Sequence, residues 1–182
     1  MKTVDQSRLV RDLIQLSDLA LQQGNHELAK KGYRHAMACL SEKIEDYELS
    51  EEVAYFLEDD ATPETTLGDF IAKYYSERLS IYDNIEDIFA IEPFFGGVEW
   101  RRNILLLSIP IAMQDFPDFE AQIKFASLLA QTGAKDEAKD MIVDGLETFS
   151  ASISFDHLAS LIHENLGHYP WSDDLIRSVY PK

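Results

Sequence analysis

The sequence predicts an all-α protein, and two observations carry that prediction. Apolar side chains recur every three or four residues along most of the 182-residue chain, whereas the strict alternation typical of β-strands is nearly absent. A pattern of small and large side chains behind a glycine also occurs twice, which is typical of two antiparallel helices joined by a short turn. We therefore expect a single all-helical domain of eight or nine helices over residues 1–182, a length sufficient to bury a core.

The two predicted hairpins share one set of spacings. Each turn contains a glycine, Gly24 or Gly133, which permits the positive φ that ends one helix. An alanine follows five residues later, Ala29 or Ala138, and its small side chain lets the two helices approach closely. The next large and small positions are Tyr33 and Ala36 in the first hairpin and Ile142 and Gly145 in the second. The packing stripes expected on the preceding helices are Leu13, Leu16 and Ala20, and Ile123, Phe125, Ala126 and Leu129.

This pattern resembles the tetratricopeptide repeat, whose 34-residue helix–turn–helix unit carries small and large side chains at such positions. The resemblance implies antiparallel hairpins stacked as a short right-handed solenoid. A further glycine, Gly167, lies 34 residues after Gly133 and marks a degenerate third unit. The units would span about residues 10–43, 119–152 and 153–181, with an irregular acidic helical section at 44–118. Another helical bundle that uses the same packing rules is the alternative fold.

The section between the two hairpins is expected to contain longer helices. Apolar residues from Leu67 to Phe89 form one stripe at helical spacing, which predicts a long helix that ends at Glu92-Pro93. Its start is predicted either at Thr62 and Pro63, as a cap and a first-turn residue, or at Thr66 and Asp69, as a capping box. A second helix should run from about Val98 to Gln114, with a kink at Pro110. Shorter helices are predicted at about 49–59, 154–166 and 172–180.

Charge is distributed unevenly along the chain. The net charge is −17, yet residues 1–44 carry +2 and residues 45–92 carry −13. Ten carboxylates lie between Glu45 and Asp69 without a single Lys or Arg. Such a field repels nucleic acid phosphates and anionic membranes and attracts basic proteins. We therefore expect no nucleic-acid or membrane partner, and the acidic section is either a solvated face or a docking site for a basic partner.

The sequence also gives an expectation for cellular location. The lone cysteine, Cys39, excludes an intramolecular disulfide and a cysteine-based zinc site. The longest apolar run, Ile104 to Met113, is too short to span a bilayer, and the first residues carry no apolar leader. These features favour a cytoplasmic protein.

No local motif predicts a catalytic, cofactor or metal site. His163 and His168 are five residues apart, whereas a zinc-binding helix places two histidines at i and i+4. Gly96-Gly97 before Arg101-Arg102 is compatible with an anion at a helix N-terminus but is more typical of a turn followed by two surface arginines. The chain has no nucleophile elbow, phosphate loop or dinucleotide fingerprint. We expect no enzyme activity and no cofactor, although a catalytic site that forms no local motif is the remaining alternative.

The tetratricopeptide resemblance implies a function in protein–protein interaction. The first helix of each unit would line a concave groove that binds a peptide or a partner helix. The groove positions implied in the first unit are Arg11, Ile14, Asp18, Leu21 and Gln22, and those in the second are Glu120, Ile123, Ser127, Ala130 and Gln131. Some family members bind a C-terminal carboxylate with a Lys and Asn clamp, which is missing because Ile14, Asp18, Ile123 and Ser127 occupy those positions.

Two functions follow as hypotheses. The first is an adaptor or chaperone-like module for a partner with apolar anchors and basic flanks. The second is an acidic mimic of nucleic acid, or a charge-based inhibitor of a basic protein, in which the repeat-like ends are only a scaffold. Salt should weaken binding by a mimic far more steeply than binding in an apolar groove.

Overall fold

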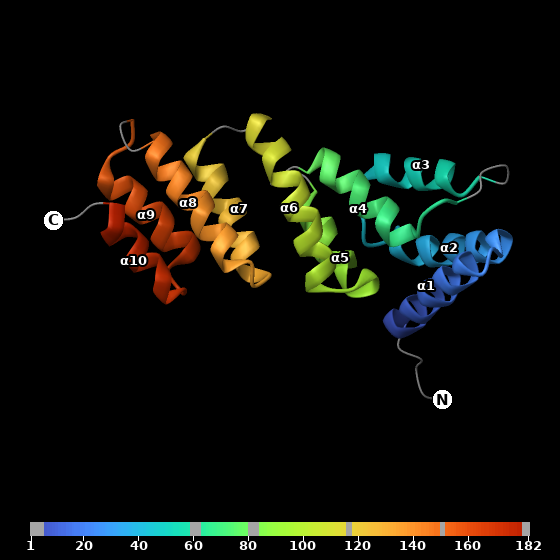
Figure 1. The fold of residues 1–182 in the computed structure, drawn as a ribbon. Helices are drawn as coiled ribbons and strands as arrows, with labels where there is room; N and C mark the ends of the chain where they lie inside the picture. Colours follow the sequence, from blue (N-terminus) through green and yellow to red (C-terminus); the bar gives the residue numbers. More distant parts are fainter. Residues whose placement is uncertain (1–5, 59–62, 80–83, 116–117, 150–151, 180–182) are drawn as a thin grey trace. The chain divides into compact units, whose positions relative to one another are not determined.

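The computed structural model describes residues 6–58, 63–79, 84–115, 118–149 and 152–179, and this part of the chain is all-helical (Figure 1). It confirms the predicted all-α class. The described helices are α1 (Gln6–Gln22), α2 (His26–Leu40), α3 (Tyr47–Phe56), α4 (Leu67–Arg78), α5 (Ile85–Phe95), α6 (Val98–Asp115), α7 (Phe119–Gln131), α8 (Lys135–Phe149), α9 (Phe155–Leu166) and α10 (Pro170–Val179).

The chain divides into two compact units, Met1–Ile104 and Leu105–Lys182, and α6 contributes to both. The first unit contains α1 to α5 and the start of α6. The second contains the rest of α6 and α7 to α10. Among the helices described, none is long and apolar enough to cross a membrane.

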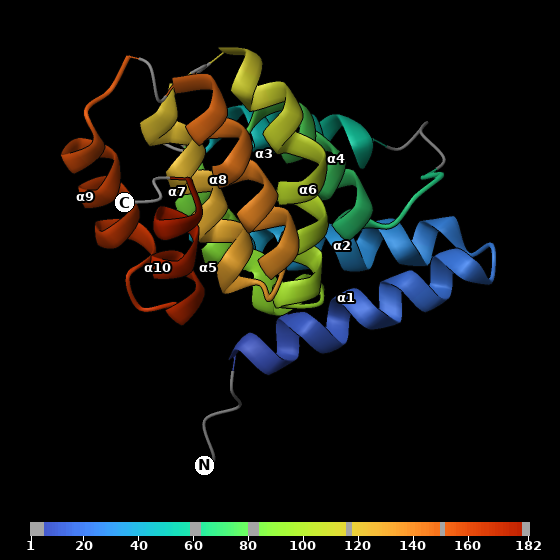
Figure 2. The same ribbon diagram turned by 60° about the vertical axis from the view of Figure 1, so that its left-hand side comes forward.

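In the first unit, α1 and α2 form an antiparallel hairpin (Figure 2). Gly24 in the turn has a φ of +74°, and the Asn25 side chain accepts a hydrogen bond from the Leu28 amide at the start of α2. Ala29 is fully buried, and the two helices approach so closely that a Cβ on Gly32 would collide with the Ser17 side chain. The hairpin packing predicted from the first glycine pattern is therefore confirmed.

The middle helices differ from the sequence-based expectation. Of the two predicted caps, Thr66 caps α4, because its hydroxyl oxygen accepts a hydrogen bond from the Asp69 amide at 3.1 Å. The other, Thr62, lies outside the described residues. The predicted long helix is wrong, since α4 ends at Arg78 and α5 begins at Ile85. The Asn84 side chain donates a hydrogen bond to the carbonyl of Arg78, the last residue of α4, at 3.0 Å.

The end of α5 also lies later than expected. Pro93 does not end the helix, which runs on to Phe95. A proline at this position removes only one backbone hydrogen bond of the helix. The helix ends at Phe95, and the next residue, Gly96, caps it with a φ of +129°. The Trp100 indole then donates a hydrogen bond to the Gly68 carbonyl at 3.0 Å, which joins α6 to the start of α4.

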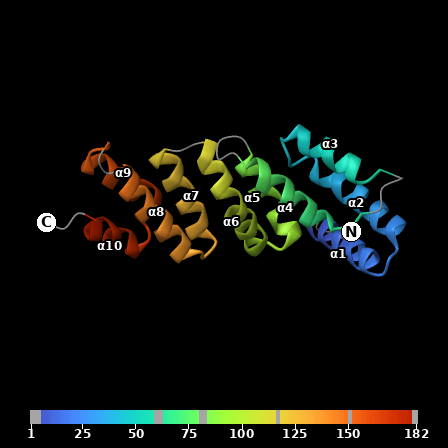
Figure 3. The same cartoon turned by 45° about the horizontal axis from the view of Figure 1, so that its top comes forward.

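In the second unit, α7 and α8 form the second predicted hairpin (Figure 3). Gly133 in the turn has a φ of +83°, and both Ala138 and Ile142 are fully buried. A Cβ on Gly145 would lie 2.7 Å from the Gln122 amide oxygen and 2.9 Å from the Phe119 ring, so the two helices approach closely at this glycine. The second glycine pattern therefore predicts the contact between its two helices correctly, as the first one does.

Enlarging a hairpin alanine should destabilise the protein. Ala29→Leu or Ala138→Leu places three additional carbons at a fully closed helix contact, and overpacking of this kind costs about 1–3 kcal/mol. Urea denaturation followed by circular dichroism measures the change. Ala38→Leu, at an exposed position of α2, is the matched control and should leave the midpoint nearly unchanged. A midpoint for Ala29→Leu equal to that of the control would contradict the packing described.

Candidate functional site

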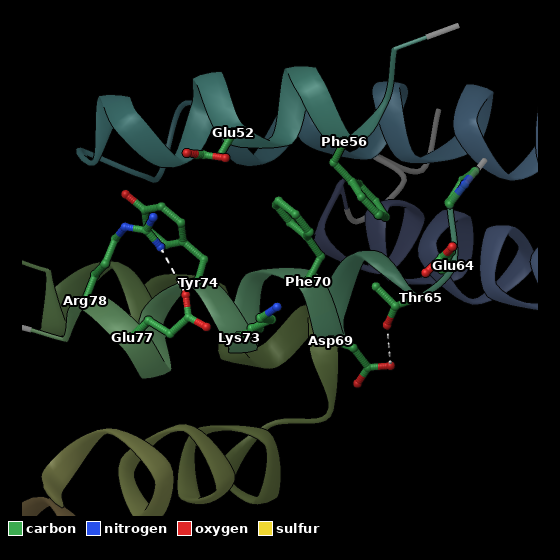
Figure 4. A pocket seen from close by; sticks show the side chains of 11 residues that line it. Glu52, Phe56, Glu64, Thr65, Asp69, Phe70, Lys73, Tyr74, Glu77 and Arg78 are labelled. Carbon is green, nitrogen blue, oxygen red and sulfur yellow. Dashed lines mark hydrogen bonds and ion pairs between the residues drawn. The ribbon is translucent and has the colours of Figure 1, made fainter. Parts of the chain in front are cut away.

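A hollow of about 780 Å³ lies between α3 and α4 (Figure 4). We call it the α3–α4 hollow. Three aromatic rings, four carboxylates and two cationic side chains contribute to its lining. They are Phe56, Phe70 and Tyr74, then Glu52, Glu64, Asp69 and Glu77, then Lys73 and Arg78, with Pro63 and Thr65 completing the wall.

Aromatic side chains form the inner surface of the α3–α4 hollow. Phe56 of α3 and Phe70 of α4 stack with ring centroids 4.4 Å apart and planes inclined by 20°. Both side chains are half-buried, so the pair is partly open to solvent. The Tyr74 ring lies further along α4, and the Arg78 guanidinium sits 4.6 Å from its centroid. The hollow therefore offers apolar ring surface to an incoming side chain.

The buried Asp87 carboxylate on α5 fixes the start of α3. It accepts hydrogen bonds from the Glu45 and Asp46 amides at 3.0 Å and from the Tyr75 hydroxyl at 3.4 Å. Asp46 in turn caps α3 through the Leu49 amide. The N-terminal end of α3 is thus held by a residue about 40 positions later in the chain.

Two cations of α2 fix the other end of α3. The buried Lys30 ammonium donates a hydrogen bond to the Glu58 carbonyl at 2.8 Å, and Arg34 donates to the Leu57 carbonyl. Carbonyls at a helix C-terminus carry partial negative charge, so cations stabilise them. With both ends of α3 attached to other helices, the spacing between α3 and α4 is set from outside the hollow.

Negative charge predominates in the α3–α4 hollow, where carboxylates outnumber cations four to two. Arg78 is engaged by Glu77 at 3.6 Å and by the Tyr74 ring. Asp69 accepts hydrogen bonds from the Thr65 and Thr66 hydroxyls. The rim therefore favours a cationic group over an anionic one.

The Tyr74 hydroxyl is hydrogen-bonded within the protein, to Asp46. Burial, together with the nearby Asp46 carboxylate, raises the pKa of Tyr74. The hydroxyl therefore stays protonated and donates to the two Asp46 oxygens at 3.1 and 3.2 Å. What Tyr74 presents to the hollow is its ring. The lining thus combines apolar rings with carboxylates, a chemistry suited to holding a cation beside an apolar group.

The groove residues implied in the first repeat-like unit have mixed positions. Arg11, Ile14 and Asp18 line a separate hollow of about 550 Å³ with the start of α4 and the segment from Pro93 to Trp100. Ile14 is only 2% exposed, so its expected position on an open groove face is wrong. The Arg11 guanidinium donates to the Pro93 carbonyl, and Asp18 accepts from the Tyr33 hydroxyl at 2.6 Å. Leu21 is half-buried and Gln22 is exposed.

Burial raises the pKa of the Asp18 carboxyl, an effect opposed in part by the hydrogen bond from Tyr33. The same contact acts on Tyr33, whose pKa is raised first by burial and then by Asp18. The hydrogen bond between the Tyr33 hydroxyl and the Asp18 carboxyl group is part of the contact that joins α1 to α2.

The groove residues implied in the second unit are mostly engaged in packing. Ile123 is fully buried, which contradicts an open groove position, because its side chain lies in the core of the unit. The Ser127 hydroxyl donates to the Asn165 carbonyl at 2.9 Å and so joins α7 to α9. Ala130 is buried. Gln131 is exposed, as is Glu120, whose carboxylate pairs with Lys124 at 2.7 Å.

Two other sequence features have structural outcomes. Arg101 is not a surface arginine: its side chain is buried, pairs with Glu92 at 3.1 Å and lies over the Phe89 ring. Leu16, expected in the packing stripe of the first helix, is instead 64% exposed, because Val10, Ile14 and Ser17 form the buried side of α1.

Sequence reasoning recognised the acidic section but missed its aromatic residues. Phe56 and Phe70 are separated by 13 residues, and their contact depends on the connection between α3 and α4. The available signal was the presence of Tyr55 and Phe56 in the acidic segment, since aromatic residues are enriched at interfaces relative to the rest of the surface.

Comparison with known proteins adds no relative, since no family model, no curated protein and no solved structure matches the chain. Within the described residues, no group of three or more His, Cys, Asp or Glu side chains is placed to hold a metal ion. Functional assignment therefore depends on the residues of this chain.

Proposed function

We propose that the protein is a non-enzymatic protein–protein interaction module that binds a basic peptide segment or helix in the α3–α4 hollow. The observation that carries this proposal is the half-exposed Phe56–Phe70 stack inside a rim of four carboxylates. An apolar anchor would lose its hydration on the rings, and burial of such anchors supplies most of the energy of a typical interface. Lysine or arginine flanks would meet the carboxylates and speed association.

The proposed scaffold is a tetratricopeptide-like solenoid with an adaptor or chaperone-like role in the cytoplasm. Two independent hairpins support it, each with a positive-φ glycine in the turn and a buried alanine at the helix contact. In such scaffolds, rigid helices present one side to a peptide. The binding residues proposed here lie on α3 and α4 rather than at the groove positions that the repeat pattern alone implies.

An acidic mimic of nucleic acid is the competing proposal. A mimic needs carboxylates spread over a surface and has no requirement for an aromatic interior. The stacked phenylalanines therefore favour peptide binding over mimicry. The two proposals differ in what should abolish binding.

The test is fluorescence anisotropy with a labelled peptide that carries a central phenylalanine between lysine flanks. Two matched peptides replace the phenylalanine with alanine or the lysines with glutamate. The parent peptide should bind the most tightly, and Phe56→Ala should weaken its binding about tenfold or more. Tyr55→Ala removes an exposed aromatic from the adjacent position of α3 and serves as the control that leaves affinity unchanged.

Charge reversal at Glu52 and Glu64 should mainly lower the association rate and flatten its salt dependence, since exposed charges steer encounter. If Phe56→Ala is silent while charge reversal abolishes binding and salt weakens binding by the parent protein steeply, the acidic-mimic proposal replaces this one. Equal affinity for the phenylalanine and alanine peptides would also contradict the proposed role of the rings.

A further inference from the structure

An apolar surface lies on the α1–α2 hairpin. Four leucines, three on α1 and one on α2, are more than half exposed: Leu9 (57%), Leu16 (64%), Leu19 (51%) and Leu28 (56%). We call this set the leucine face. Single exposed leucines need no explanation, but a cluster on one helix pair marks an interaction surface.

The leucine face is hollowed between its two helices. Leu16, Leu19 and Leu28 line a depression of about 600 Å³, together with the half-buried Leu13. The close contact of Gly32 with Ser17 holds α1 against α2 beneath it. The surface is therefore formed in advance, and an apolar side chain can enter it without rearrangement of the hairpin.

The apolar face of α1 is broader than the part of it that is buried. Val10 and Ile14 are buried against the rest of the Met1–Ile104 unit. When the apolar face of a helix extends beyond its buried part, the remainder is available for a further apolar contact. The exposed leucines of α1 thus indicate a second packing partner.

Charge indicates which partner fits. The chain as a whole carries −17, so two copies repel each other over most of their surface. Residues 1–44 are the exception, with a net charge of +2. Around the leucine face, charges of both signs occur: Arg8 lies 3.9 Å from Asp12, and Glu27 and Lys31 are exposed on α2. When the leucine faces of two copies meet, the charges around them do not add up to a large excess of positive or negative charge.

We propose that two copies of this chain dimerise through the leucine face, the hairpin of one against the hairpin of the other. A two-fold interface uses every leucine twice, once from each copy. The 17 residues of α1 span about 25 Å and two adjacent helices are about 20 Å wide, so the contact buries about 500 Å² on each copy, or about 1,000 Å² in all, which is the size of a weak interface. Such an area is consistent with a micromolar dimer.

Sedimentation equilibrium of the full chain, across the micromolar range, tests the proposal. The mass should rise from one to two chains with concentration. Leu16→Glu should raise the dissociation constant about a hundredfold, because it places a charge in a desolvated contact. Leu107→Glu, at a leucine of α6 with 63% exposure, is the matched control and should dimerise like the parent. Leu16→Ala, which preserves helix propensity, should weaken the dimer about tenfold and guards against misfolding of the charged variant.

Salt distinguishes this dimer from other assemblies. Docking through the leucine face should tighten as salt rises, because screening reduces the repulsion between two chains of −17. Head-to-tail docking of the basic hairpin onto the acidic section of another copy would weaken with salt and grow beyond two chains, and either result would overturn the proposal. A single-chain mass at every concentration, or equal effects of Leu16→Glu and Leu107→Glu, would overturn it as well.

Discussion

Asp87→Ala is expected to lower the free energy of unfolding of the Met1–Ile104 unit by roughly 3–5 kcal/mol. The Asp87 carboxylate is 4% exposed and accepts hydrogen bonds from the Glu45 and Asp46 amides and the Tyr75 hydroxyl. Alanine leaves these three donors without this acceptor. The Tyr75 hydroxyl is buried and the two amide hydrogen bonds are part-buried, and a buried donor left unsatisfied costs about 1–3 kcal/mol, so the combined loss is large.

Urea denaturation followed by circular dichroism measures this effect. Asp87→Asn retains one carbonyl acceptor and should lose only part of the stability. Glu86→Ala, the exposed neighbour on α5, is the control and should change stability by less than about 0.5 kcal/mol. Similar midpoints for Asp87→Ala and Glu86→Ala would show that the carboxylate does not hold the start of α3.

Arg101→Leu should destabilise the same unit by about 3–5 kcal/mol. The Arg101 side chain is buried, lies 3.1 Å from the Glu92 carboxylate and covers the Phe89 ring. Removal of the guanidinium leaves the largely buried Glu92 without its counter-charge, and an uncompensated charge in the interior is costly.

The double variant Glu92→Leu/Arg101→Leu should recover most of the lost stability, because it removes both charges and fills the space with apolar atoms. Arg102→Leu breaks the exposed pair with Glu99 at 3.3 Å and should cost no more than about 1 kcal/mol. A double-mutant cycle measured by urea denaturation separates the pair interaction from the loss of packing. If the double variant is no more stable than Arg101→Leu, the ion pair is not the cause of the effect.

The sequence predicts the hairpins well because their determinants are local. A glycine with positive φ and an alanine five residues later act within one turn and one helix contact, as Gly24 and Ala29 illustrate. The assignment of Leu16 to the core failed because the apolar face of α1 is broader than its buried part, and Leu16 lies on the exposed part. Periodicity identifies the whole apolar face but does not say which part of it packs against the rest of the unit.

The long helix predicted from Leu67 failed for a related reason. The apolar spacing continues across the break between α4 and α5, where the Asn84 side chain donates a hydrogen bond to the Arg78 carbonyl at the end of α4. Side-chain contacts with the backbone compete with helix formation and leave no trace in the apolar pattern.

The candidate site was predictable only in its charge. Consecutive carboxylates are visible in the sequence, and they border the α3–α4 hollow. The position of α3 depends on Lys30 and Asp87, which lie on either side of it in the chain, and Asp87 reaches back 41 and 42 residues. Contacts over such separations cannot be deduced from spacing. The groove positions Ile14 and Ile123 failed for the same reason, since their burial is a property of the folded unit.

The way in which α3 is attached has a consequence for the energetics of binding. Inside α3 only Leu49 and Val53 are buried, against seven buried residues in α2, so the short helix contributes little to the core and depends on its end contacts. Helices of this kind open by local unfolding at a lower free energy than the domain as a whole. A ligand that requires α3 in its folded position would stabilise the folded form of α3 by mass action. Its observed affinity would be lower than its affinity for that folded form, because folding of α3 costs free energy. Occupancy of the α3–α4 hollow and the folding of α3 are therefore one linked equilibrium.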